Sequence, residues 1–110
     1  MPVWKVPLVT AEPTIRLSNW SIREVDGEAL HLVGLNVTSR EGRVTSAIEF
    51  LDLATRRART QSGRLYELVG SPGFHSDAEY VFGVWCAGYS VKSSRDVTLE
   101  LLEARGSESA

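Results

Sequence analysis

The dipeptide Asp26-Gly27 lies between two apolar runs and constrains the fold more than any other feature of the 110-residue chain. Both residue types tolerate the positive φ angles of a tight two-residue hairpin turn. The flanking runs, 14–25 (TIRLSNWSIREV) and 29–37 (ALHLVGLNV), have the composition of strands. The second run is apolar on both faces, as central strands are. We therefore predict a β-hairpin whose second strand is central in a sheet.

The first strand of this hairpin carries a slip in its apolar pattern. Ile15 and Leu17 alternate with polar residues, and the next apolar positions are Trp20 and Ile22. Because side chains alternate between the two faces of a strand, a slip of one residue moves every later side chain to the other face. The pattern predicts a β-bulge near Asn19.

Shorter signals predict the rest of a sheet. We expect a turn at 40–42, a strand at 43–52, a loop at 53–56 and a strand at 57–68 that bends or bulges at Ser62-Gly63. Ile48 and Phe50 would share one face of the strand at 43–52.

One clear helix is predicted over 76–88. Ser76 and Glu79 have the spacing of a capping box, in which each residue bonds the other's amide. Apolar residues then recur at helical spacing: Ala78, Val81, Phe82, Trp85 and Tyr89. This side of the helix would cover a sheet face that bears Ile22, Leu32, Ile48 and Phe50.

Residues 96–104 are compatible with two structures. Val97, Leu99 and Leu101 alternate as in a strand, whereas Asp96 as an N-cap would begin a helix. The β-branched start favours the strand.

Together these elements predict a single α+β domain over 14–104. It has a mainly antiparallel, twisted sheet of about five strands with one helix packed on one face. Residues 1–13, with three prolines, are expected to form an extended N-terminal arm, and 105–110 a disordered polar tail. Whether Trp4 and Trp20 are buried or lie at an interface stays open.

Composition narrows the function classes. The net charge of -2 provides no global attraction to nucleic acid or to a membrane. The single cysteine, Cys86, excludes an internal disulfide and is typical of a reducing compartment. No apolar run approaches the roughly 20 residues of a membrane-spanning helix, and 1–7 lacks the apolar core of a signal peptide. We expect a cytoplasmic protein.

Residues that could carry chemistry do not form a known catalytic or metal-binding pattern. Cys86 lies far from the start of the predicted helix, without a neighbouring cation to activate it. His75 and Asp77 are better explained by the helix start than by metal binding, and His31 lies within an apolar strand. We assign no catalytic residue, no metal ligand and no cofactor.

A basic segment is the most informative feature for function. Residues 40–64 hold six arginines against three acidic residues, a local charge of +3. Arginine binds carboxylates and phosphates through two parallel hydrogen bonds. The predicted partner-binding residues are Arg56, Arg57, Arg59, Arg64 and Tyr66. A solvated, edge-protecting role for the same arginines is the plain alternative.

Three segments also resemble a family of small bacterial proteins of unknown function, some of them carried by phages or mobile elements. The resemblance covers roughly 14–90 and rests on 42–48 (GRVTSAI), 60–68 (TQSGRLYEL) and 77–86 (DAEYVFGVWC). It implies a bacterial, cytoplasmic origin. By analogy, proteins of this kind are often inhibitors or accessory binders of larger host machines.

Three functions follow from these observations. The leading hypothesis is a non-enzymatic protein-binding module, an inhibitor or accessory factor of a larger bacterial machine, that uses the segment from Arg56 to Tyr66. The first alternative is nucleic-acid binding through the same arginines. The second is a small enzyme that uses His75, Asp77 or Cys86. Homo-oligomerisation stays open.

Overall fold

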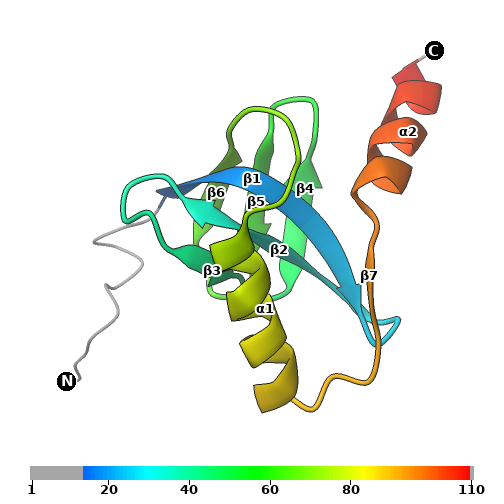
Figure 1. The fold of residues 1–110 in the computed structure, drawn as a ribbon. Coiled ribbons are helices and arrows are strands. Elements are labelled where there is room, and N and C mark those ends of the chain that lie inside the picture. The colour runs from blue at the N-terminus through cyan, green and yellow to red at the C-terminus, as the bar shows by residue number, and fades with distance from the viewer. Residues whose placement is uncertain (1–13, 110) are drawn as a thin grey trace.

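The computed structural model describes residues 14–109, with side chains for 14–104, so the arm expected at 1–13 lies outside the described residues. Seven strands and two helices form within this range (Figure 1). Their bounds are β1 Thr14–Val25, β2 Ala29–Asn36, β3 Gly42–Val44, β4 Ile48–Asp52, β5 Arg57–Thr60, β6 Leu65–Leu68, α1 Ser76–Gly88, β7 Ser94–Asp96 and α2 Thr98–Ser109. The α+β class is confirmed.

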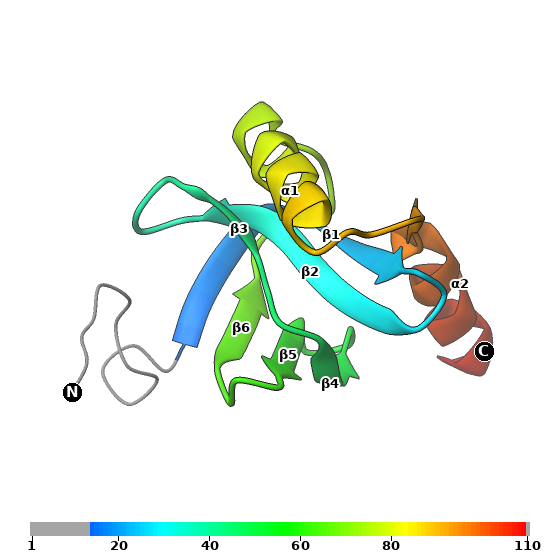
Figure 2. The ribbon, with the colours of Figure 1, turned by 90° about the horizontal axis from the view of Figure 1, so that it is seen from below.

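The sheet is mostly antiparallel, as expected, but one parallel pair makes it mixed, and it has seven strands among the described residues where about five were expected. Its strand order is β3-β2-β1-β6-β5-β4, and β7 pairs with β1 beside this path. β1 runs antiparallel to β2 and β7, whereas its first residues run parallel to β6. The sheet bends strongly, so that α1 lies on one side of the β1–β3 layer and β4–β6 on the other (Figure 2).

The predicted hairpin and its bulge are both confirmed. Asp26 and Gly27 have φ angles of 52° and 68°, and the Glu28 amide donates to the Val25 carbonyl at 3.0 Å. The pairing of β1 with β2 shifts register between Ser18 and Ser21. Asn19, in this interval, has a φ of 49°, so the bulge lies where the slip in the apolar pattern predicted it.

The strands β1 and β2 have two apolar faces, and the bulge keeps Ile15, Leu17, Trp20 and Ile22 on the same one. One face belongs to an inner cluster between the two halves of the bent sheet, and the other packs against α1. The buried inner cluster comprises Ile15, Leu17, Trp20, Ile22, Leu32, Leu53, Ala58, Tyr66, Leu68 and Val97. Trp20 is fully buried and donates its indole N–H to the Gly70 carbonyl at 3.1 Å.

The predicted partner face of the helix was wrong. α1 has the predicted bounds, but it packs through Ala78 and Phe82 on Val25 and Val33. Ile22, Leu32 and Ile48 belong instead to the inner cluster, and Phe50 is 49% exposed. The helix therefore covers the opposite face of the hairpin, because the curled half of the sheet already fills the other.

Two strand predictions also need correction. The strand expected at 43–52 is divided into β3 and β4, because the chain leaves β2 after Val44 and next pairs with β5. The strand expected at 57–68 is an antiparallel hairpin, β5 and β6, with Ser62-Gly63 as its turn. A turn and a bend share the same glycine signal, and only the pairing of β5 with β6 distinguishes them.

The cap of α1 differs from the predicted box. His75, not Ser76, is the N-cap, and its Nδ1 accepts the Asp77 amide at 3.1 Å. The Glu79 carboxylate turns to Arg23 instead of the helix start, at 2.5 Å. An ion pair with a buried guanidinium is stronger than a bond to an exposed amide.

The C-terminal segment is a helix, so the preference for a strand at 96–104 was wrong. β7 is short, and the Asp96 carboxylate at its end accepts the Thr98 amide, the first of α2, at 2.9 Å. Val97 is buried in the inner cluster. The bounds of α2 extend to Ser109 and so into the segment expected to be a disordered tail.

Arg23 connects β1 to the elements that pack on it. Its side chain is 8% exposed and donates to Ser21 Oγ at 2.9 Å and to Glu79 at 2.5 Å. Asp96 lies 3.7 Å away. The guanidinium also stacks over the ring of Phe82, 4.9 Å from its centroid.

We predict that Arg23→Met destabilises the fold by about 2–4 kcal/mol, because it leaves the Glu79 and Asp96 carboxylates without their buried partner. Arg16→Met is the matched control: its exposed ion pair with Glu67, 3.7 Å long, is expected to contribute less than about 1 kcal/mol. Urea denaturation measures both losses. Equal losses would contradict the central role of Arg23.

Gly42 lies where β3 touches the start of α1, and no side chain fits there. A Cβ at Gly42 would lie 2.6 Å from the Asp77 carbonyl oxygen and 2.8 Å from the Ala78 Cα. We predict that Gly42→Ala destabilises the fold by about 1–3 kcal/mol through this overlap with backbone. Gly83→Ala, where nothing lies within 4 Å on an exposed helical turn, should stabilise it by about 0.5–1 kcal/mol. If the urea midpoints of Gly42→Ala and Gly83→Ala move in the same direction, the close contact between Gly42 and the start of α1 is contradicted.

Candidate functional site

Two of the predicted partner-binding residues lie together on an exposed face. Arg57 and Arg59 alternate outward on β5. Arg59 pairs in register with Phe50 of β4 on one side and with Leu65 of β6 on the other. Phe50 and Leu65 are 49% and 45% exposed. We call this group, Phe50, Arg57, Arg59 and Leu65, the Phe50–Leu65 surface.

The other three predicted residues point elsewhere. Arg64 and Tyr66 are 4% and 2% exposed, and the Tyr66 hydroxyl accepts from Arg43 Nε at 3.0 Å. Arg56 stacks over Trp20, 5.2 Å from the ring centroid, and its Nη1 is buried without a hydrogen-bond partner among the described residues. The structure therefore does not bring the five predicted residues onto one surface.

The Phe50–Leu65 surface is hollowed and mixed in charge. A shallow groove of about 250 Å³ runs between its side chains. Arg57 lies 4.0 Å from Glu67, and Arg59 lies 3.8 Å from Glu49, all four side chains being substantially exposed. Exposed ion pairs of this length contribute little to stability, so the guanidinium groups can exchange these carboxylates for others at little cost.

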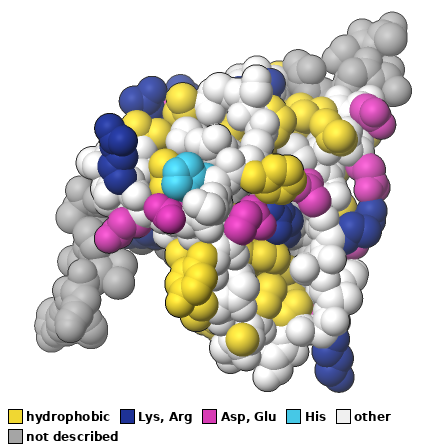
Figure 3. Space-filling view, in the orientation of Figure 1, with side chains coloured by type: hydrophobic (Ala, Val, Ile, Leu, Met, Phe, Trp, Pro, Cys, Tyr) yellow, Lys and Arg dark blue, Asp and Glu magenta, His cyan; other side chains and the backbone are white. Residues whose placement is uncertain are grey.

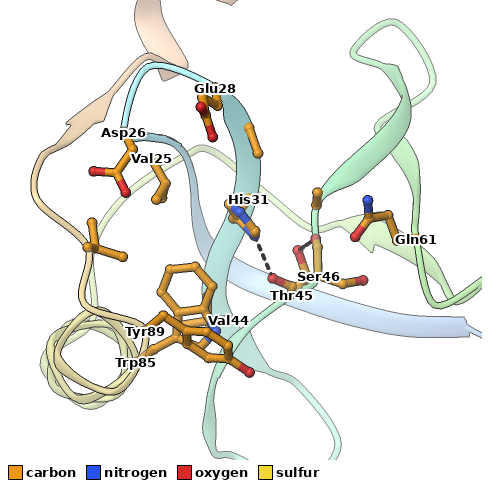
Figure 4. A pocket seen from close by; sticks show the side chains of 13 residues that line it. Val25, Asp26, Glu28, His31, Val44, Thr45, Ser46, Gln61, Trp85 and Tyr89 are labelled. Atoms are coloured by element: carbon orange, nitrogen blue, oxygen red, sulfur yellow. Dashed lines mark hydrogen bonds between the residues drawn. The ribbon is translucent and has the colours of Figure 1, made fainter.

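A second and larger hollow lies on the α1 side of the hairpin. This cleft, of about 640 Å³, is formed by the β1–β2 turn, β2, the segment after β3, the β5–β6 turn and the end of α1. Figure 4 shows its side chains. The lining residues are Val25, Asp26, Glu28, Ala29, His31, Val44, Thr45, Ser46, Ala47, Gln61, Trp85, Tyr89 and Val91.

In this cleft His31 lies between an aromatic wall and the polar segment that follows β3. Its ring is 4.8 Å from that of Trp85, and its Nδ1 is 2.9 Å from the Thr45 carbonyl oxygen. Because a carbonyl only accepts, Nδ1 carries a proton and donates. Nε2 has no hydrogen-bond partner among the described residues. Tyr89 extends the aromatic wall, its centroid 4.9 Å from that of Trp85.

Sequence reasoning missed this cleft, although part of its signal was available. Alternation along β2 puts His31 on the same face as Val33, and Trp85 and Tyr89 are one helical turn apart. Each feature alone describes ordinary packing. Their convergence depends on which face α1 covers, and that contact is not local in sequence.

The residues proposed for an enzyme do not converge. His75 caps the start of α1, and Cys86 lies about three turns further along, roughly 16 Å away by helical rise. Cys86 packs against the cluster of Phe82 and Val33. Burial raises the pKa of the Cys86 thiol, opposed by the positive charge of Arg23 and reinforced by Asp26.

Two other features, a metal-binding cluster and a membrane-spanning helix, are absent from the described residues. No group of three or more His, Cys, Asp or Glu side chains within it could hold a metal ion. No helix in the same range is long and apolar enough to cross a membrane. Figure 3 shows hydrophobic side chains in several separate groups on the face that bears α1, with acidic side chains between them.

Comparisons with protein-family models, with curated proteins and with solved structures found no match for this chain. The resemblance to small bacterial proteins therefore stays a prediction.

We predict that alkylation of Cys86 by iodoacetamide has its pH midpoint above that of the same chain in concentrated urea. The raised pKa keeps the thiol protonated in the fold, and only the thiolate attacks. Rates measured from pH 7 to 10 by mass spectrometry test this. A midpoint at or below that of the unfolded chain would indicate an activated cysteine and reopen the enzyme hypothesis.

Proposed function

We propose that the protein is a binding module for another protein, and that the Phe50–Leu65 surface makes the contact. The observation that carries this proposal is the row Phe50, Arg59 and Leu65 across three paired strands, with both apolar side chains about half exposed. Phenylalanine and arginine are enriched at the centres of protein interfaces. The apolar side chains of Phe50 and Leu65 would lower their free energy by leaving water.

The chemistry of the surface favours a partner segment with an acidic residue beside an apolar one. A partner carboxylate would replace Glu49 at Arg59 or Glu67 at Arg57, and it would gain two parallel hydrogen bonds. An apolar side chain would enter the groove between Phe50 and Leu65. The finer idea, that the partner belongs to a larger bacterial machine, rests on the resemblance alone.

Nucleic-acid binding is the weaker hypothesis for the function of the same arginines. Two glutamates lie within 4.0 Å of Arg57 and Arg59 and reduce their combined charge. Single-strand binding also needs aromatic rings along the groove for bases to stack on. Phe50 is the only aromatic side chain of the Phe50–Leu65 surface, since Tyr66 is 2% exposed.

We predict that the double variant Arg57→Glu/Arg59→Glu loses a protein that the wild type retains from nuclease-treated lysate of its source cells. Charge reversal would repel the partner carboxylates. Arg40→Glu/Lys92→Glu is the matched control, because it changes the net charge equally at exposed positions outside the surface. Phe50→Ser should lower retention as well. Quantitative mass spectrometry of the bound fraction is the measurement.

Two results would contradict the proposal. One is a bound fraction that is the same for the reversal and control variants. The other is retention of nucleic acid in place of protein once nuclease is omitted. If the logarithm of that affinity falls linearly with the logarithm of the salt concentration, the result favours the nucleic-acid alternative.

A further inference from the structure

We propose that the cleft between α1 and the β1–β2 hairpin binds an organic cation, an ammonium or guanidinium group on a short apolar stem. The cleft shares no residue with the Phe50–Leu65 surface, so this site is additional to the proposed protein contact. Three independent properties of its lining carry the inference: charge, hydrogen-bonding type and exposed aromatic rings.

The charge of the lining excludes anions and favours cations. Asp26 and Glu28 are the ionised residues among the lining side chains, which include no lysine or arginine. Asp26 accepts the amides of Lys92 and Ser93 with one oxygen, at 2.8 and 2.9 Å, which holds the carboxylate in place. Glu28 is exposed and has no ion-pair partner among the described residues. A phosphate or carboxylate ligand would meet both negative charges without compensation.

Several side chains of the cleft present hydrogen-bond acceptors. Nδ1 of His31 is committed to donating to the Thr45 carbonyl, so the Nε2 of a neutral imidazole is an acceptor. His31 is 8% exposed, and its ring is fixed between Trp85 and that hydrogen bond. The carboxylates of Asp26 and Glu28 accept only. An ammonium or guanidinium group, which only donates, matches these atoms.

The aromatic wall suits the rest of such a ligand. Trp85 and Tyr89 lie one turn apart at the end of α1, with ring centroids 4.9 Å apart. Tyr89 is 70% exposed, so much of its ring is accessible. A cation over such a ring is attracted by its quadrupole, while an aliphatic stem can pack beside Val44 and Val91. Figure 4 shows the two rings facing the hairpin that carries Asp26, Glu28 and His31.

The cleft is preformed, so a ligand would not need to organise it. The Thr45 hydroxyl accepts the Leu32 amide at 3.0 Å, and the Thr45 amide donates to the Leu32 carbonyl at 3.0 Å. On the far side, the Gln61 amide donates to the Ala47 carbonyl at 2.9 Å. These bonds hold the polar wall against β2 and β5, which lowers the entropic cost of binding.

The test is a titration followed by the indole N–H signals of the ¹⁵N-labelled full chain. The probes are cadaverine, a free diamine, and the amide-blocked residues N-acetyl-lysine and N-acetyl-arginine methylamide. N-acetyl-norleucine methylamide is the uncharged control. We expect saturable shifts of the Trp85 signal with a cationic probe, at least fivefold tighter than with norleucine. The Trp20 signal serves as an internal reference, because its N–H is bonded to Gly70 in the inner cluster.

Two variants probe the two recognition elements separately. Glu28→Gln and Tyr89→Leu should each weaken binding of the cationic probe by about fivefold. Both residues are exposed, so the fold should tolerate either change. Glu103→Gln, which removes an exposed carboxylate from α2, is the matched control and should leave binding unchanged.

The outcomes separate the sources of the cation. Saturable binding of the amide-blocked lysine or arginine but not of cadaverine would support the proposal, with a protein side chain as the ligand. Saturable binding of cadaverine but not of the blocked residues would support it with a free amine as the ligand. The proposal is overturned by equal binding of norleucine, by the absence of a saturable Trp85 shift with every cationic probe, or by unchanged binding in both variants.

Discussion

The buried guanidinium of Arg23 on strand β1 holds helix α1 and strand β7 to that strand. It lies on the α1 side of β1 and meets Glu79 of α1 and Asp96 at the end of β7, while its plane covers the ring of Phe82. Burying a charge is favourable only where its donors are matched with acceptors. The position of Arg23 therefore constrains α1 and β7 together.

Arg23 can occupy this place because of the bulge at Asn19. Before the bulge, Ile15 and Leu17 point into the inner cluster, and after it Trp20 and Ile22 do so. Arg23 consequently faces α1, where it meets Glu79. A strand without the extra residue would expose Trp20 and bury Asn19. One local irregularity thus lets a single strand serve two cores, with β6 paired along its first part and β7 along its last.

Features encoded by neighbouring residues were predictable, and those that depend on distant pairing were not. The Asp26-Gly27 turn, the bulge and the bounds of α1 each have a local physical cause, and each is confirmed. The division of 43–52 into two strands depends on β5, which comes later in the chain. Alternation along β5 could have placed Arg57 and Arg59 on one face. Arg56 precedes that strand and Tyr66 lies on β6, so their orientation depends on how β5 pairs with β6.

The two candidate sites differ in charge: the Phe50–Leu65 surface is mixed, whereas the cleft is acidic. The Phe50–Leu65 surface presents guanidinium groups beside apolar side chains, whereas the cleft presents carboxylates and a histidine acceptor beside aromatic rings. The two linings share no residue, so the two proposed ligands, an acidic protein segment and an organic cation, would not occupy the same space. Both sites depend on β1 for their position, the first through β6 and the second through the hairpin with β2.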